Sequence, residues 1–326
     1  METTIIGAMP KLPSSPGEVN LRRTIQDFDA GRIGPGELEA AYRTKEAQVL
    51  MDQVARGITV LGDGQVRWDD LVSPLGLDVA NYVPGGLVRF FTNNTYYRRP
   101  TITGRLALAG STLAARFARV RAQASRPLKA ALPGPYTALT LALDQQYTSM
   151  DSALADACAV WALLIEAHAE AGAHVMELEE PALARERDAG RRRAALQAIG
   201  DLGKSSPVPL RLALYFGDVA PWAGELADLP LHGISFDLAQ SPRMWDVLAE
   251  GFPGVVGLGL VDARDLRFED VDETAARVRL LLKRLGTERL WLHPNTSLEY
   301  LPADAAMAKL ELVGEIRRRV EREVHP

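Results

Sequence analysis

HVMELEEP, residues 174–181, is a short apolar run that reaches two adjacent acids and a proline, and a helix-like stretch follows it. Four further runs have this form, each reaching an acid before the next helix-like stretch: ITVLGDG (58–64), LRLALYFGD (210–218), GISFD (233–237) and VVGLGLVDA (255–263). Continuous Val, Leu and Ile runs that alternate with helices are typical of buried parallel strands in βα units. Because chemistry in such sheets lies at the carboxyl ends of the strands, the acids predict the lining of one shared pocket.

The rest of the chain predicts an α/β fold, a single (β/α)8 TIM-type barrel with N-terminal decorations. Its 326 residues exceed the ~250 of a typical barrel, and we expect one domain over residues 1–326. The five runs and the other expected strands, among them TTIIG (3–7), amount to about eight, which is the number of strands in a TIM barrel. The first hundred residues are the least regular. There, WDDLVSPLGLD (68–78) predicts the start of a helix and FFTNNTYYRRP (90–100) predicts a loop with polar and aromatic tips.

Composition narrows the possible partners. The chain has 37 Lys and Arg residues against 42 Asp and Glu residues, a formal net charge of -5. No global basic field therefore draws it to nucleic acid or to an anionic membrane, and a small-molecule substrate is the expected partner. No glycine-rich phosphate loop follows a strand, since GDGQ lacks both Walker and dinucleotide spacing, so no nucleotide cofactor is expected.

Cys158 is the only cysteine, so no intrachain disulfide can form. It lies in the apolar helical pattern of residues 151–172, which favours a core thiol over a nucleophile. Residues 1–17 lack a basic segment followed by a long apolar run, and no later stretch predicts a helix that spans a bilayer. We therefore expect a cytoplasmic protein.

Seven segments at the strand ends occur in the order and approximate spacing found in cobalamin-independent methionine synthases, a family that the chain resembles over nearly its whole length. The segments are TTIIGAMP, LPGPYT, ELEEPAL, ALYFGD, LPLHGISFDLAQSP, LGLVDAR and LHPNTSLEYLP. That family has two β/α barrels, a metal-free amino-terminal one and a carboxy-terminal one with zinc, homocysteine and methylfolate, and shorter relatives have a single barrel. This chain resembles a single barrel, closer to the amino-terminal one.

The resemblance implies where a family zinc site would lie. There a His-x-Cys pair, a Glu on the next strand and a Cys on the last hold the metal, and the matched positions fall on Leu212 and Leu214, Asp237 and Thr296. Leucine cannot coordinate a metal, and the missing thiolates are what suit zinc to bind and activate a thiol. We expect no metal and no cofactor.

The family also holds the amino group of homocysteine with an acid in the segment that matches ITVLGDG. That position is Gln65 here, with Asp63 nearby, and a serine after the first strand has become Ala8. Homocysteine recognition therefore departs from the family pattern.

The acid pair Glu179-Glu180 matches a family turn that orients an amine or pterin group. Adjacent side chains on a strand point to opposite faces, so only one of the two can face the pocket. Asp237 ends a strand and should face the mouth, whereas Asp262 either faces the mouth or caps the following turn. Alternation puts His293 inside the barrel with Trp291, as a general base, as an alternative metal ligand with Asp237 and Glu179, or bonded to a neighbouring loop.

The Asn- and Tyr-rich loop predicts a surface that stacks on a flat heterocycle such as a pterin, or an ordered surface loop. The candidate residues divide into two groups. The catalytic candidates are Asp237, Glu180 and His293, and the substrate-binding candidates are Asp63, Gln65, Asn94, Tyr97, Glu179, Tyr215, Asp262 and Thr296.

Three functions remain open from the sequence. The first is a methyltransferase that moves a methyl group from a folate-type carrier to a thiol such as homocysteine in methionine biosynthesis. The second is a metal-free accessory barrel that binds substrate or a separate zinc-bearing single-barrel homologue. The third is a lyase or decarboxylase that uses carboxylates on the same scaffold. Methyl transfer to a thiol needs a thiolate, and without zinc the sequence offers no evident device to make one.

Overall fold

The computed structural model describes residues 1–324, and eight parallel strands form one sheet in them. The strand order is β1-β13-β12-β11-β10-β9-β7-β2, so that strands of this sheet that are consecutive along the chain from β2 to β13 are also neighbours in space. At its two edges the amides of Thr59 and Val60 donate to the Thr3 carbonyl oxygen at 3.2 and 3.0 Å, which joins the first strand to the second. The strands are β1 (Glu2–Thr3), β2 (Leu61–Gly62), β7 (Leu128–Pro133), β9 (Val175–Glu179), β10 (Leu210–Leu214), β11 (Gly233–Asp237), β12 (Val255–Val261) and β13 (Leu290–Pro294). The predicted TIM-type barrel is confirmed.

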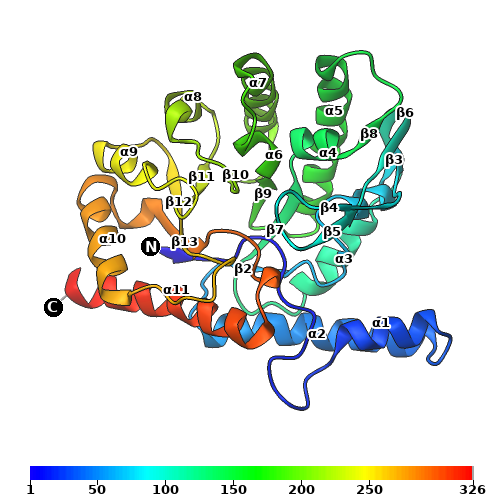
Figure 1. Cartoon of the computed structure of the whole chain (residues 1–326), viewed down its shortest axis with the longest axis horizontal. Helices are drawn as coiled ribbons and strands as arrows, with labels where there is room; N and C mark the ends of the chain where they lie inside the picture. Colours follow the sequence, from blue (N-terminus) through cyan, green and yellow to red (C-terminus); the bar gives the residue numbers. More distant parts are fainter. Residues whose placement is uncertain (325–326) are drawn as a thin grey trace.

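Helices surround this sheet (Figure 1). Leucine, valine and alanine side chains on their inner faces pack against the outward side chains of the strands in one continuous core. The helices are α1 (Leu21–Asp29), α2 (Pro35–Ala55), α3 (Thr112–Arg121), α4 (Pro135–Leu141), α5 (Met150–Glu170), α6 (Pro181–Ala184), α7 (Ala189–Ser205), α8 (Ala223–Ala227), α9 (Met244–Glu250), α10 (Val271–Leu285) and α11 (Ala303–Val324). The final two residues of the predicted domain, 325 and 326, lie outside the described part of the chain.

Helix α5 is long and apolar enough to cross a membrane by length and composition alone. Of its apolar 18-residue stretch, 44% is buried inside the protein. The expectation that no stretch reaches this threshold is therefore wrong for this helix. Its buried side packs against α7, α4 and β6, with Trp161 and Leu164 each 1% exposed. Core helices of soluble proteins share this length and composition, so neither property assigns α5 to a membrane.

The N-terminal decorations are more ordered than the sequence predicts. Residues 68–78 form turns and a short 3-10 helix, η1 (Ser73–Leu77), instead of the predicted helix start. Pro74 and Gly76 disfavour a longer helix there. The next residues enter a small sheet of β3 (Val79–Val83), β6 (Thr101–Leu108) and β8 (Leu143–Asp144).

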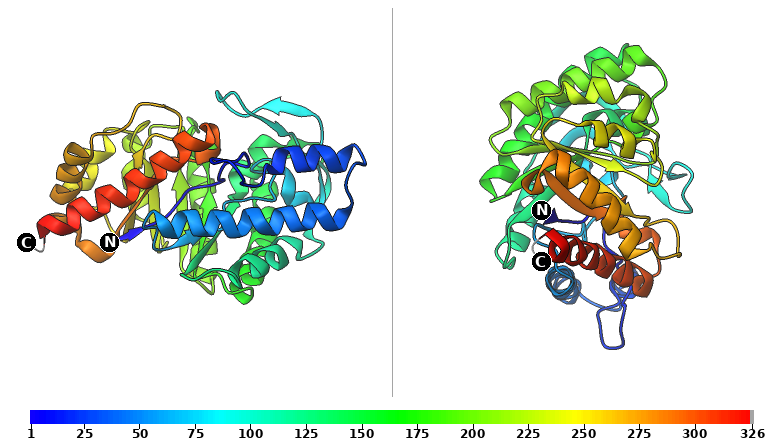
Figure 2. Two further views of the ribbon diagram at one scale, coloured as in Figure 1. Left: turned by 90° about the horizontal axis from the view of Figure 1, so that it is seen from below. Right: turned by 90° about the vertical axis from the view of Figure 1, so that its left-hand side faces the viewer.

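Part of the predicted Asn- and Tyr-rich loop is an antiparallel hairpin, β4 (Leu87–Arg89) paired with β5 (Tyr96–Arg98). This hairpin stands out from the body of the molecule in both views of Figure 2. Phe90, in the turn between the two strands, and Tyr97 on β5 pack in an apolar cluster with Ile6, Ala213 and Tyr215, which come from the barrel strands or the loops that follow them. The hairpin therefore forms one wall above the carboxyl ends of the strands.

Side chains inside the barrel lie in layers. The floor is apolar and consists of Val60, Val175, Val255 and Trp291. A charged layer follows, and Glu179 lies one layer further toward the carboxyl ends of the strands, two residues after Glu177 on the same face of β9. The site of interest is therefore at the predicted end of the barrel.

Candidate functional site

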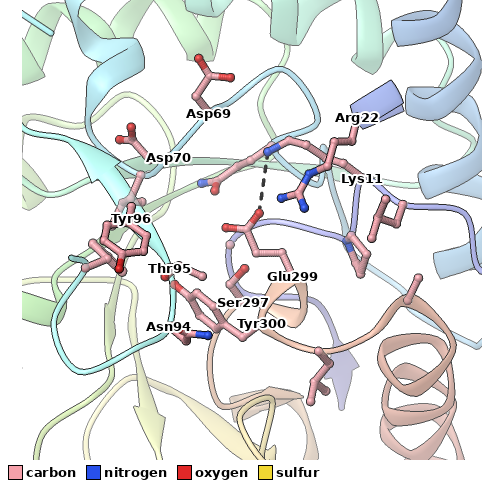
Figure 3. Close-up of a pocket in the computed structure, with 18 of the residues that line it drawn as sticks. Lys11, Arg22, Asp69, Asp70, Asn94, Thr95, Tyr96, Ser297, Glu299 and Tyr300 are labelled. Atoms are coloured by element: carbon pink, nitrogen blue, oxygen red, sulfur yellow. Dashed lines mark ion pairs between the residues drawn. The ribbon is translucent and has the colours of Figure 1, made fainter. Parts of the chain in front are cut away.

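A cavity of about 430 Å³ opens at the carboxyl ends of the strands (Figure 3). Its floor and walls come from the end of β9, from the loops after β1, β2, β10 and β13, from helix α1 and the start of α11, and from the hairpin. The lining side chains that carry polar groups are Lys11, Arg22, Gln65, Asp69, Asp70, Asn94, Thr95, Tyr96, Glu179, Tyr215, Ser297, Glu299 and Tyr300. This volume suits a small-molecule ligand.

Glu179 is the carboxylate at the bottom of this cavity and is 1% exposed. The side-chain amide of Gln65 donates to its Oε1 at 2.9 Å, and the hydroxyl of Tyr215 donates to its Oε2 at 2.7 Å. Burial and the neighbouring Glu177 raise the pKa of Glu179 to about 7, although both hydrogen bonds oppose the shift. Glu179 therefore exchanges a proton close to neutral pH.

Gly7 lets the backbone after β1 pass beside this carboxylate. Its φ is +61°, and a Cβ there would lie 3.0 Å from the Ser297 Cβ and 3.3 Å from Glu179 Oε2. The Ser297 hydroxyl joins the two loops, since it accepts from the Ala8 amide at 3.1 Å and donates to the Ala8 carbonyl at 2.9 Å. The substitution of serine by Ala8 therefore keeps the loop anchored through its backbone.

The cavity wall carries charges of both signs. Lys11 Nζ lies 3.8 Å from Glu299 Oε2, and Figure 3 shows Arg22 beside them. Burial raises the pKa of Glu299, and Lys11 opposes that shift. Burial, with Glu299 and Glu179 nearby, raises the pKa of Tyr300 well above its usual range, so its hydroxyl stays protonated and can donate. A ligand with both an ammonium and a carboxylate group finds partners for each on this wall.

The hairpin contributes Asn94, Thr95 and Tyr96 to the cavity. Of the two loop residues predicted from the sequence, Asn94 lines the cavity and Tyr97 does not. Tyr97 is 5% exposed and its hydroxyl donates to the Leu141 carbonyl at 2.9 Å, whereas Tyr96 is 59% exposed. The sequence pointed to Tyr97 rather than Tyr96, because residues 90–100 were predicted as a loop and strand alternation was not applied to them.

Glu180 faces away from the cavity, as expected for one member of the acid pair. Its Oε1 accepts from the Tyr136 amide at 2.9 Å, and its Oε2 accepts from the amide and hydroxyl of Thr137 at 2.8 and 2.6 Å. These contacts satisfy the first turn of α4. Burial raises the pKa of Glu180 to about 7, but this carboxylate has no access to a ligand in the cavity.

Asp237 ends β11, two strands from the strand of Glu179, and lies outside the cavity lining. It accepts hydrogen bonds from the amides of Phe216, Ala239 and Gln240 at 3.2, 3.1 and 3.0 Å. Asn295 Nδ2 donates to Asp237 at 3.0 Å and to Asp262 at 3.2 Å, which ties three strand ends together. Burial raises the pKa of Asp237. Its position indicates a structural role.

Four more candidates lie outside the lining of the cavity. His293 is inside the barrel, as alternation predicts, with Nδ1 2.8 Å from the Pro294 carbonyl oxygen, and burial lowers its pKa to about 3. Thr296 is fully buried. Asp63 turns toward α3, where it lines a separate small cavity of about 20 Å³, and burial raises its pKa to about 6. Asp262 accepts from the Arg264 amide at 2.9 Å, which is the predicted turn cap.

The matching of the zinc ligands needs a correction. Leu212 and Leu214 point outward into the core between strands and helices, whereas Arg211, Ala213 and Tyr215 point inward. Matching by segment placed the His-x-Cys pair one residue out of phase with the strand alternation. The inward residues offer no thiolate or imidazole, both oxygens of Asp237 already accept hydrogen bonds, and residues 1–324 contain no group of three or more acids, histidines or cysteines placed to hold a metal.

Sequence reasoning missed part of the wall and the charged layer under Glu179. Lys11, Arg22 and Glu299 belong to loops and a helix whose distance from the cavity cannot be read from local patterns. Lys129 and Arg211 had a usable signal, since a basic residue inside an apolar strand is rarely buried unless it is paired.

Comparisons with known proteins agree with this architecture. The family model described as "Cobalamin-independent synthase, N-terminal domain" matches residues 76–286. A methionine synthase of Sulfolobus acidocaldarius is 27% identical over 313 residues, covering 95% of this chain and 89% of the relative. One from Saccharolobus solfataricus is 25% identical over 328 residues, covering 99% and 96%.

Solved structures show the same fold. A B12-independent methionine synthase from Shewanella sp. W3-18-1, in complex with selenomethionine, superposes with a TM-score of 0.81 at 18% identity, covering 99% of this chain and 98% of that one. A methyltransferase from Methanosarcina mazei has a TM-score of 0.60 at 14% identity, covering 98% and 94%.

Proposed function

The chain belongs to the cobalamin-independent synthase family, and from this premise we propose that it transfers a methyl group from a folate-type carrier to the thiol of an amino acid such as homocysteine. Its class, a methyltransferase of methionine synthesis, follows from the family and from curated methionine synthases that match nearly its whole length. We also propose a cytoplasmic location, in keeping with amino-acid biosynthesis. The observation that carries the proposal is the placement of Glu179 under the cavity.

Glu179 is the proton acceptor in this proposal. It takes the thiol proton, the sulfur then attacks the methyl carbon, and the bond between that carbon and the carrier breaks with its electron pair left on the carrier. The carrier finally takes up the proton from Glu179. Transfer from a thiol of pKa about 8.5 to a carboxylate of pKa about 7 is uphill by only about 2 kcal/mol, against about 6 kcal/mol for an ordinary glutamate. The raised pKa therefore matches the task.

The surrounding groups give the acceptor its binding site. Gln65 and Tyr215 hold the carboxylate in place, and each of its oxygens retains a lone pair for the ligand. Lys11 and Arg22 suit the carboxylate of an amino acid, and Glu299 suits its ammonium group. No step passes through zinc, because the inward residues at the family position do not fit that metal.

The test is methionine formation from homocysteine and methylated folates, followed by mass spectrometry, with metal analysis of the same protein. We expect turnover without stoichiometric zinc, and a rate that rises with pH through about 7 as Glu179 ionises. Glu179→Gln should lower kcat by about 10²- to 10⁴-fold and remove that pH limb. Glu180→Gln is the matched control, since this carboxyl is equally buried but faces α4. Loss of turnover on chelation, restored by zinc, would refute the metal-free mechanism.

An accessory role is the second candidate. It is favoured by the match to an N-terminal domain, and weakened by the curated relatives, whose length the chain nearly fills. An accessory barrel should bind a zinc-bearing single-barrel homologue through an interface of about 1,600 Å² and raise its turnover while inactive alone. Two separate peaks in size-exclusion chromatography of the mixture, with unchanged turnover, would discard it.

A further inference from the structure

Three charged side chains fill the barrel directly beneath Glu179. Lys129, Glu177 and Arg211 are 2%, 0% and 0% exposed. Lys129 Nζ donates to Glu177 Oε1 and to the Ile5 carbonyl oxygen, the latter at 2.6 Å. Arg211 Nε lies 3.9 Å from Glu177 Oε2. One carboxylate is thus shared between two cations in a layer that no solvent reaches.

The barrel is shaped to hold this layer. The Arg211 guanidinium lies over the Trp291 ring at 4.1 Å and donates to the Ser235 hydroxyl at 3.0 Å. A Cβ at Gly257 would lie 2.4 Å from the Ser235 Oγ and 2.9 Å from an Arg211 nitrogen. Glycine at this strand position therefore leaves the space that the guanidinium occupies.

Stability alone does not account for these charges. Three atoms of the layer have no hydrogen-bond partner among the described residues: Glu177 Oε2 and Arg211 Nε and Nη1. The same is true of Nε2 of the neighbouring His293. Buried ion pairs with unsatisfied atoms often cost more than hydrophobic residues of the same volume. Such groups concentrate where they act on a functional site.

The layer is coupled to the cavity by short connections. Glu177 precedes Glu179 by two residues on the same face of β9. Lys129 holds the Ile5 carbonyl, and the same loop two residues later is Gly7, beside Glu179 Oε2. The protein interior screens electrostatic interactions poorly, so a change of charge in the layer changes the electrostatic potential at Glu179.

We propose that Lys129 and Glu177 are positioning residues that determine the charge of Glu179 and hold its loop in place, an inference that rests on the proposed function. The two act in opposite directions, because the Lys129 cation favours the Glu179 carboxylate and the Glu177 anion disfavours it. Arg211 adds a second cation, since its pKa, lowered by burial to about 10, still leaves it protonated at neutral pH.

Each of the other groups around Glu179 either does not titrate near neutral pH or lies further up the cavity wall. Gln65 and Ser297 are uncharged, and burial raises the pKa of Tyr215 and of Tyr300 well above the usual range. His293 is neutral because burial lowers its pKa to about 3. The charged or titratable groups that face Glu179 are Lys129 from β7, Glu177 from β9, Arg211 and Tyr215 from β10 and its loop, His293 from β13, and Glu299 and Tyr300 from η4 (Leu298–Tyr300).

The experiment titrates Glu179 directly, as its carboxyl band in infrared difference spectra between the ligand-free protein and its Glu179→Gln variant. Lys129→Met should raise the pKa of Glu179 by about one unit, and Glu177→Gln should lower it by a similar amount. Lys129→Arg keeps the positive charge and should leave the pKa of Glu179 at its value in the parent protein. Lys309→Met is the matched control, because Lys309 is 0% exposed and paired with Glu269 at 2.9 Å on the outside of the barrel.

The outcomes separate this inference from the proposed function. Circular dichroism identifies which variants fold, and either folded variant tests the proposal because the expected shifts have opposite signs. A Glu179 titration that does not move, or that moves in the same direction in both variants, overturns it. Because no substrate is present, a failed methylation assay refutes the proposed function without touching this result.

Discussion

Neighbouring residues at the strand ends meet very different surroundings, and Glu179 and Glu180 are the clearest pair. Both are buried and both have a pKa raised to about 7 by burial. Glu179 bonds to side chains under the cavity, whereas Glu180 bonds to the backbone of α4. A perturbed pKa therefore indicates function only where the group also reaches a cavity.

Asp237 tests the same distinction. Asp237→Ala leaves the buried amide of Phe216 and the partly buried amides of Ala239 and Gln240 without an acceptor, so we expect a loss of about 3 kcal/mol in the free energy of unfolding. Asp237→Asn retains one acceptor oxygen and should lose less. Affinity for methionine, measured by calorimetry in the folded variants, should stay near that of the parent protein. Unchanged stability with lost affinity would instead place Asp237 in the binding site.

At the scale of elements, the hairpin decides what the barrel mouth can hold. Its turn packs on the aromatic cluster around Tyr215 and Phe216, with Phe90 and Phe216 centroids 6.2 Å apart. Asn94 in the same turn and Tyr96 at the start of β5 line the cavity. One end of the hairpin is thus both fixed on the barrel and exposed to the ligand.

Tyr96 and Tyr97 separate these two roles. Tyr96→Ala removes an exposed ring from the cavity wall, so ligand affinity should fall about tenfold with an unchanged melting temperature. Tyr97→Phe removes the hydrogen bond to Leu141 and should cost about 1 kcal/mol of stability with unchanged affinity. Calorimetric binding and thermal unfolding of both variants provide the measurement. The reverse assignment of effects would show that Tyr97 contacts the ligand.

At the scale of the whole molecule, buried ionisable groups control how stability depends on pH. Burial raises the pKa of five carboxyls among the described residues: to about 6 for Asp63, to about 7 for Glu179 and Glu180, and upward also for Asp237 and Glu299. They stabilise the fold fully below their unfolded values and lose that contribution as pH rises through about 7. Three histidines, His168, His232 and His293, have a lowered pKa and act oppositely, but only below about pH 6.5.

The two effects oppose each other below pH 6.5, and only the carboxyls remain above it. We therefore expect the free energy of unfolding to fall between pH 6.5 and 8 by about 1 kcal/mol for each of Glu179 and Glu180. Melting temperatures across this range measure it. The double variant Glu179→Gln/Glu180→Gln should flatten the dependence, and a slope that survives in it would assign the effect to other groups.

The sequence by itself determined the parallel strands, their βα alternation and the end of the barrel at which polar groups gather. These features are local, because an apolar run, the acid that ends it and the helix after it lie within about 30 residues. Alternation also fixed relative facing, so that His293 shares the interior with Trp291 and only one of Glu179 and Glu180 reaches the cavity.

Only the tertiary structure decided which member of each alternating pair faces inward, and which distant segments meet. Alternation says that adjacent residues face opposite sides of a strand but does not say which side is the inside. In β10, the packing of the helices against Leu212 shows that Leu212 faces outward and Arg211 faces the barrel interior. The Ala8–Ser297 contact spans 289 residues, and Lys11, Arg22 and Glu299 meet over the same cavity. Such contacts depend on how the barrel closes and the decorations fold over it, which no local pattern encodes.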